Sequence, residues 1–256
     1  MLFHGNARLQ RKRREGGNGL RIHLKERRPE TADVISFIFD LDGQPFEYRP
    51  GQYVTYQLDA LAFPDPRGPG RHFTISSSPT EKGIVMFTTR MRGSGFKETL
   101  RNAPSGYELS IGVPVGRFVM SEESETRHHV FMAGGIGVTP YRSILRHAAD
   151  RKKPIHALIF CFNHSSAEIV FRQELEEIAR QMPTLSVVHV LSEPEPGWRG
   201  ERGKLDEELL RKYVPDPEQF LYWISGPPPM VQAYKDLLAK VGVTDKSVRT
   251  DSFTGY

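Results

Sequence analysis

Two short segments of the chain combine residue types that can bind a phosphorylated ligand with a flat ring. The first, RHFTISS at Arg71–Ser77, places a cation, an aromatic ring and hydroxyl groups close together. A guanidinium can bind phosphate, a ring can stack, and hydroxyls can make hydrogen bonds. The second, GGIGVTP at Gly134–Pro140, is a glycine-rich turn that can open a helix, whose free amides attract phosphate. Their order predicts an electron carrier with two nucleotide sites.

The glycine-rich segment is suited to a close approach between backbone and ligand. Its three glycines, Gly134, Gly135 and Gly137, permit tight turns. Thr139 is placed to cap the following helix, and Pro140 suits its first position. Such a turn also occurs without a ligand, but open parallel sheets bind ligands after their first strand. This place in the chain therefore favours a nucleotide site.

The first segment must be positioned by β-structure, because apolar residues alternate from residue 20 to about 120. Short stretches rich in β-branched and aromatic residues are separated by Gly, Pro and Asp turns. The predicted strands are Leu20–Lys25, Val34–Phe39, Tyr53–Leu58, Phe73–Ser76, Ile84–Thr89 and Tyr107–Ile111. Six such strands predict an antiparallel Greek-key barrel.

After residue 125, strands alternate with helices, which predicts a parallel α/β sheet covered on both faces. Its five predicted strands are His129–Ala133, Ile155–Phe162, Leu185–Leu191, Phe220–Ser225 and Ser247–Phe253. The predicted helices are Pro140–Ala148, Ala167–Gln181, Asp206–Tyr213 and Pro228–Val241. Ser165–Glu168 is a predicted capping box for the second of these helices, and Asp206 is the predicted cap of the third. We therefore predict a tail at 1–19, a β-barrel domain at 20–122 and an α/β domain at 123–256.

Composition limits the chemistry further. The 256 residues are 38% hydrophobic, contain no apolar run of bilayer length and begin without a secretory signal, which predicts a cytoplasmic protein. Cys161 is the only cysteine, so the chain has no internal disulfide, no cysteine-ligated iron–sulfur cluster and no CxxC pair. We expect it to be buried. Electron chemistry within this chain must use a bound organic cofactor.

The net charge of +4 is concentrated near the N-terminus, at Arg8, Arg11, Lys12, Arg13 and Arg14. Without interleaved aromatics or an amphipathic pattern, this tail is more typical of a solvated segment than of a nucleic-acid or membrane contact. Attraction of an acidic protein partner stays open.

Several motifs in a fixed order resemble the ferredoxin–NADP(+) reductase superfamily. They are Pro50-Gly51-Gln52-Tyr53, RHFTISS, Arg92-Gly93-Ser94-Gly95-Phe96, GGIGVTP, Ser225-Gly226-Pro227 and the terminal DSFTGY, and together they span nearly everything after residue 20. The resemblance implies FAD as cofactor and NADH or NADPH as co-substrate. It implies that Arg71 holds the FAD diphosphate, that Phe73 packs on the isoalloxazine, and that Thr74 lies near flavin N5. Phe73 replaces the more frequent tyrosine, so one hydroxyl contact is lost.

The resemblance also assigns the later motifs. Gly93, Ser94 and Gly95 would supply a second phosphate contact ahead of a short helix at 96–100. Ser225 stands where cysteine is frequent and would help align the nicotinamide, with Gly226 and Pro227 beside it. Candidates for a direct role in hydride transfer are Thr74, Ser225, Asp251 and Phe253; the further cofactor-binding candidates are His72, Ser77, Thr89 and Tyr256. Plain alternatives are a surface turn at 92–95, a rigid proline turn at 225–229 and a tail packed for stability.

The implied activity is hydride transfer between nicotinamide and flavin N5, with electrons passed to or from ferredoxin, flavodoxin or an oxygenase component. A flavin or quinone reductase, the reductase component of an oxygenase, and a non-catalytic nucleotide-binding regulatory subunit are the alternatives. The segment Asn163–Ser166 lacks an arginine, which favours NADH. However, a 2′-phosphate site can still form from His164 and Ser165 together with Arg172, Arg199 or Arg202.

Overall fold

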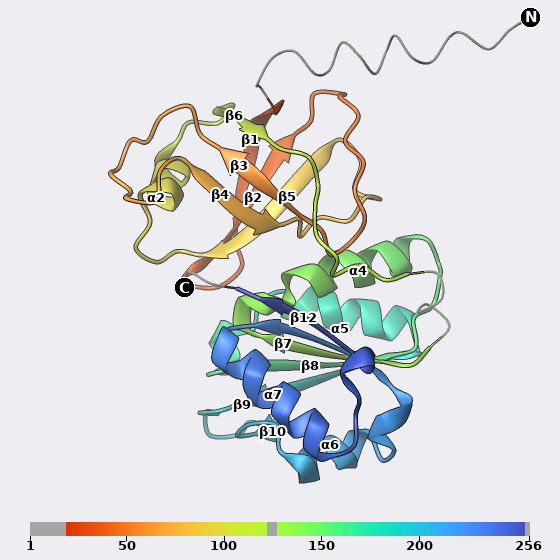
Figure 1. Cartoon of the computed structure of the whole chain (residues 1–256). Coiled ribbons are helices and arrows are strands. Elements are labelled where there is room, and N and C mark those ends of the chain that lie inside the picture. Colours follow the sequence, from red (N-terminus) through yellow and green to blue (C-terminus); the bar gives the residue numbers. More distant parts are fainter. Residues whose placement is uncertain (1–18, 122–126, 254–256) are drawn as a thin grey trace, which may run out of the picture.

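The computed structural model describes residues 19–121 and 127–253, and it contains two six-stranded sheets (Figure 1). The first is antiparallel, in the order β4-β3-β6-β1-β2-β5. Its strands are β1 Leu20–Pro29, β2 Val34–Asp40, β3 Tyr53–Gln57, β4 Gly70–Thr74, β5 Ile84–Arg90 and β6 Glu108–Ile111, and helix α2 covers Gly95–Asn102. The amide of Ser76 donates to the carbonyl of Met86 (2.8 Å) and joins the two edges. The predicted barrel is confirmed.

The barrel encloses its own apolar core, as the period-two pattern predicts. Phe37, Phe39, Val85 and Phe87 are fully buried on the paired strands β2 and β5. Strand β4 starts three residues earlier than predicted and ends at Thr74. The flavin-type motif therefore begins in the strand and continues into the loop that follows it.

The second sheet is parallel, in the order β10-β9-β8-β7-β11-β12. Its strands are β7 His129–Gly134, β8 Ala157–Asn163, β9 Leu185–Leu191, β10 Glu201–Arg202, β11 Leu221–Gly226 and β12 Val248–Ser252. The prediction of five strands was wrong, since β10 is a sixth. With two residues between Gly200 and Gly203, β10 is too short to show an apolar pattern.

Helices cover both faces of the parallel sheet (Figure 1). The helices are α4 Thr139–Asp150 and α5 Arg172–Gln181 on the face toward the barrel, and α6 Glu207–Tyr213 and α7 Pro228–Lys240 on the other. Single 3₁₀ turns lie at η1 Gly135–Val138, η2 Ser166–Glu168, η3 Pro217–Gln219 and η4 Asp245–Ser247. Cys161 is buried in β8, as expected. Among the described residues, no helix combines the length and apolar character needed to cross a membrane.

Two of the predicted helix caps were wrong and one is confirmed. Asp206 accepts a hydrogen bond from the amide of Leu209 (2.8 Å) and caps α6. Ser165 instead precedes the short turn η2 without a side-chain cap, and α5 starts only after Phe171. Thr139 is the first residue of α4 rather than its cap, because η1 already leads the chain into the helix.

The barrel and the parallel sheet share an apolar contact. Phe118 packs edge-on against Tyr141 of α4 and Trp223 of β11, with ring centroids 5.8 and 5.1 Å away. Residues 1–18, 122–126 and 254–256 lie outside the described structure, and with them the basic tail and Tyr256. The domain limits at 19/20 and 122/123 stay predictions.

Candidate functional site

A cavity of about 370 Å³ lies where the barrel meets the parallel sheet, and we call it the first cavity. Strands β4 and β5, helix α2, the glycine-rich turn and the C-terminal segment all contribute to it. Its lining residues are Tyr53, Arg67, His72, Phe73, Thr74, Thr88, Thr89, Lys97, Ile136, Thr139, Asp251, Ser252 and Phe253. The structure thus brings together candidates from three motifs that are far apart in the sequence.

The ring of Phe73 is held firmly at the wall of this cavity. It stacks on Phe87 with centroids 4.2 Å apart and planes within 4°. Tyr56 contacts it edge-on at 6.0 Å, and Phe96 lies at 5.9 Å. A ring fixed in this way can present a defined apolar surface to a flat ligand.

Asp251 is an unusual carboxylate in this cavity, because burial raises its pKa to about 6. It lies on β12 opposite Ser225 of β11. Two residues later, the amide of Phe253 donates to the carbonyl of Gly226 (3.0 Å), which anchors the C-terminal segment at the sheet edge. Perturbed carboxylates of this kind cluster at functional sites.

A second cavity of about 520 Å³ lies at the C-terminal edge of the parallel sheet. It is lined by Arg90, Arg92, Gly134, Gly135, Ile136, Phe162, Asn163, His164, Glu168, Ser192, Gly203, Lys204, Pro227, Pro229, Met230, Ala233 and Tyr234. Ile136 borders both cavities. This is the edge at which open parallel sheets bind nucleotides.

The glycines of the turn are required by its geometry. Gly135 has a φ of +51°, and a Cβ atom at Gly137 would lie 2.2 Å from the carbonyl oxygen of Ser225. The turn is therefore pressed against the end of β11. Pro140 follows inside α4, where it is buried.

Several predicted site residues line neither cavity, namely Arg71, Ser77, Gly93, Ser94, Gly95, Gly137, Pro140, Ser225 and Gly226. Ser225 is fully buried, and its Oγ has no hydrogen-bond partner within residues 19–121 and 127–253. Ser77 is also fully buried, and its Oγ accepts from the amide of Met86 (3.0 Å). A direct role for either in cofactor binding stays a prediction.

Arg71 is engaged by a protein carboxylate. Its guanidinium is 7% exposed and lies 2.5 Å from the carboxylate of Asp65. Asp65 Oδ2 also accepts from the hydroxyl of Ser94 (2.9 Å) and from the amide of Phe96 (3.0 Å) at the start of α2. Burial alone would raise the pKa of Asp65, but these hydrogen bonds hold it well below its ordinary value. Asp65 thus takes up part of the donor set that the sequence assigns to a diphosphate.

The loop carrying Asp65 fits closely over the start of α2. A Cβ atom at Gly95 would lie 2.4 Å from the carbonyl oxygens of Phe63 and Pro64. Gly93, by contrast, has a φ of +45° and open space around it. Gly95 is therefore required for the close packing of the loop, and Gly93 allows the left-handed backbone conformation of the turn. Phosphate binding by Gly93 and Gly95 stays a prediction.

Two cations that belong to none of the predicted site residues, Lys97 and Arg67, also line the first cavity. Lys97 is 7% exposed, and its pKa is lowered to about 8 by burial and by the nearby cations Arg67, Arg71 and Arg92. Its position in the first turn of α2 opposes the helix dipole. Its Nζ donates to the carbonyl of Arg90 (2.7 Å), which holds the cation at the cavity wall.

The segment after β8 is also occupied by internal contacts. His164 Nδ1 lies 3.1 Å from Ser192 Oγ, and its Nε2 lies 3.1 Å from a carboxylate oxygen of Glu193. Arg172 stacks on Trp198, and Arg202 donates to the carbonyl of Trp198 (2.9 Å). None of the arginines proposed for a 2′-phosphate lines the second cavity, whereas Lys204 does.

Known proteins share both halves of this arrangement. Residues 131–236 match the model of the oxidoreductase NAD-binding domain. The chain is 31% identical over 88% of its length to a glycine betaine monooxygenase reductase subunit of Pseudomonas aeruginosa, and it spans 61% of that relative's length.

Solved structures agree on the fold. The FAD/NAD-binding domain of nitric oxide dioxygenase from Vibrio cholerae has a TM-score of 0.79 at 20% identity, over 92% of this chain and 99% of that one. A ferredoxin–NADP(+) reductase from Neisseria gonorrhoeae with bound FAD and NADP has a TM-score of 0.73 at 16% identity, over 91% and 97%. With the barrel, the parallel sheet and the matched nucleotide domain in place, the chain contains an oxidoreductase NAD-binding domain and has the fold of these FAD- and NAD-binding proteins.

Proposed function

We propose that this chain is an FAD-dependent NAD(P)H oxidoreductase that passes electrons to a separate redox protein. The observation that carries the proposal is the adjacency of the two cavities at Ile136. Hydride transfer requires donor and acceptor to be held in contact, and two adjoining ligand spaces meet that need. We assign FAD binding to a domain at 20–122 and nicotinamide binding to a domain at 123–256.

The residues of the first cavity fit FAD. Its volume of about 370 Å³ lies within the range of small-molecule sites. Phe73 offers a fixed ring surface, and Thr74 and Thr89 offer hydroxyls. Lys97 and Arg67 line the cavity, and Arg71 and Arg92 are near Lys97, whereas the carboxylates of Asp65 and Asp33 pair with Arg71 and Arg92, so positive charge exceeds negative charge among these residues. Such an excess suits a diphosphate.

When bound, FAD supplies the ability to accept a hydride and to release electrons singly. The chain would position it: Phe73 and Thr74 from the barrel side, Thr139 from the turn, and Phe253 from the C-terminal segment. Asp251, with a pKa of about 6, can hold a proton at its carboxyl in mildly acidic solution. Direct roles for Thr74, Ser225, Asp251 and Phe253 are part of this proposal.

For the electron acceptor we propose an oxygenase component, with ferredoxin or flavodoxin as alternatives. The similarity to the reductase subunit of a glycine betaine monooxygenase supports this choice. A cytoplasmic location is part of the proposal, because cell metabolism supplies NAD(P)H. A flavin or quinone reductase is the second candidate within the same class of enzymes.

The test is anaerobic titration of the purified protein. We expect it to retain FAD, to bleach with one equivalent of NADH or NADPH, and to reduce a redox protein faster than free flavin or quinone. Protein that cannot be reconstituted with FAD would contradict the proposal. Protein that binds FAD without bleaching would indicate a regulatory subunit instead.

Lys97→Met should weaken FAD retention by roughly tenfold or more, because a buried cation beside the diphosphate is lost. In the parent, FAD affinity should fall as the pH rises through about 8, the pKa at which Lys97 loses its charge in the flavin-free protein. Equilibrium dialysis at pH 7 and 9 measures both effects. Arg101→Met, an exposed change on the same helix, is the control and should retain FAD like the parent.

For the co-substrate we predict NADH. The carboxylate of Glu193 beside His164 opposes a 2′-phosphate electrostatically, although its exposure makes the effect small. Glu193→Gln should therefore raise the efficiency with NADPH a few-fold and leave that with NADH unchanged. A ratio of kcat/KM above about tenfold in favour of NADPH in the parent would reject this preference.

A further inference from the structure

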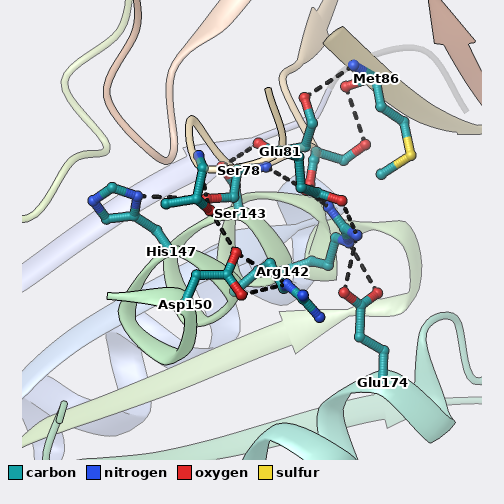
Figure 2. Close-up of polar contacts among 12 residues, drawn as sticks. Ser78, Glu81, Met86, Arg142, Ser143, His147, Asp150 and Glu174 are labelled. Carbon is teal, nitrogen blue, oxygen red and sulfur yellow. Dashed lines mark hydrogen bonds and ion pairs between the residues drawn. The ribbon is translucent and has the colours of Figure 1, made fainter. Parts of the chain in front are cut away.

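One cation lies buried where the two domains meet, outside both cavities. Arg142 of α4 is 3% exposed, and its guanidinium binds carboxylates from two directions (Figure 2). Its Nη1 and Nη2 atoms bind the two oxygens of Glu81 at 2.5 and 2.9 Å, and its Nε donates to Glu174 (2.9 Å). Burial alone would lower the pKa of Arg142, but the two carboxylates outweigh it and keep the side chain charged.

These contacts join three separate segments. Glu81 belongs to the loop between β4 and β5 of the barrel, whereas Glu174 lies in the first turn of α5. Arg142 Nη1 also donates to the carbonyl of Ser76 (2.8 Å). The ring centroid of Phe171 lies 5.6 Å from the guanidinium carbon of Arg142. The backbone of Phe171 has a φ of +57°. An aromatic side chain is rarely found in that conformation, so surrounding contacts must maintain it.

The neighbouring residue on α4 reinforces the connection. Ser143 is fully buried, and its Oγ donates to the carbonyl of Ser77 (2.6 Å). Arg142 and Ser143 together therefore hold the backbone of two consecutive barrel residues against one turn of α4. We call this set of contacts the α4 clamp.

The α4 clamp is close in the chain to both walls of the first cavity. On the barrel side, Ser76 follows Thr74 by two residues. On the α4 side, Arg142 follows Thr139 by three residues, close to one helical turn. Thr74 and Thr139 both line the first cavity. A shift of α4 relative to Ser76 would therefore change the separation of the cavity's two walls.

We propose that Arg142 is a positioning residue for hydride transfer, which fixes the glycine-rich turn of the nicotinamide side against the flavin-side strand. This inference rests on the proposed function. A planar guanidinium that binds both oxygens of Glu81 and, through its Nε, one oxygen of Glu174 sets both distance and orientation, which a lysine cannot do. Small displacements of reacting groups lower rates far more than they lower affinity. Arg142 thus acts on the rate through geometry, without touching either ligand.

The test compares Arg142→Lys with the parent and with Arg146→Met, a change at an exposed arginine one turn further along α4. In FAD-loaded protein, we expect Arg142→Lys to slow single-turnover reduction by NADH by on the order of tenfold or more. FAD content and the Kd for NADH should change less than threefold. Arg146→Met should match the parent. A lysine variant with the parental reduction rate would overturn the proposal, as would a variant that only melts earlier.

A second measurement needs no cofactor. In the flavin-free lysine variant, we expect faster amide hydrogen exchange both at residues 74–78 and at residues 135–140, relative to the parent. Unchanged exchange at 135–140 would overturn the proposal, because the turn would then be fixed without Arg142. If the lysine variant does not fold, Arg142→Met combined with Glu81→Gln and Glu174→Gln removes the unpaired carboxylates and undergoes the same two measurements. Failure of the proposed function would show in the parent protein, as missing FAD or missing bleaching.

Discussion

Arg71→Ala should destabilise the flavin-free protein by about 3 kcal/mol, because it leaves the carboxylate of Asp65 without its buried cation. For a chain of this size, that corresponds to a fall in Tm of about 6–12 °C. The amide and hydroxyl donors at the start of α2 remain, so the protein should still fold. Chemical denaturation of the apo-protein at pH 7 measures the change. The same variant should also lose FAD more readily than the parent.

The double variant Asp65→Asn, Arg71→Ala separates the two roles. Its stability should exceed that of Arg71→Ala alone, since no buried carboxylate is left uncompensated. Equal stabilities would show that the pair contributes little.

Asp65→Asn alone tests the competition at this site. We expect it to be less stable without flavin but to hold FAD at least as tightly as the parent, because Arg71 and the start of α2 no longer face a protein carboxylate. A loss of FAD in this variant would mean that the Asp65 carboxylate is part of the binding architecture.

Asp251→Asn should stabilise the protein at pH 7.5 and leave it unchanged at pH 4. The carboxyl titrates near pH 6 in the folded protein but near 3.8 in a model compound. The folded state therefore binds the proton more tightly, and stability decreases as the pH rises from about 4 to about 6. The difference corresponds to at most about 3 kcal/mol above pH 7, which asparagine would restore.

Denaturation curves at the two pH values check this expectation. Asp245→Asn, a change at a highly exposed carboxylate, is the matched control and should show no such pH dependence. The expectation is contradicted if the stability of the parent does not decline between pH 4 and 6 relative to that of the asparagine variant. A site that keeps a destabilising carboxylate does so for function, so we also expect Asp251→Asn to slow reduction by NADH.

The regular elements could be predicted because each has a period that the apolar residues follow. Strands β3 and β6 alternate between buried and more exposed residues, and strand β7 of the parallel sheet is buried along its whole length. Strand β10 could not be predicted in this way, since its two residues pair only because the preceding loop returns to β9. The start of α5 was missed because Phe171 adopts a left-handed conformation that its residue type does not indicate.

The motifs predicted several residues of the site, but they did not predict which charged side chains pair with one another. Phe73, Thr74, Asp251 and Phe253 line one cavity together with Thr139, which the motifs had assigned to the second nucleotide site. That Arg71 pairs with Asp65 depends on how a proline-rich loop folds, and no local pattern encodes that. Arg142 was read only as part of a helix, because its partners are more than thirty residues away in either direction.

Ile136 forms part of the wall of both cavities, so the proposed flavin and nicotinamide sites share a side chain. A larger residue there would narrow both chambers, and a smaller one would enlarge both. The two specificities therefore cannot be optimised separately at this position during evolution or in protein engineering. A change selected for a new nicotinamide donor would alter the flavin chamber in the same step, and would need compensation from residues such as Thr89 or Met230 that border only one of them.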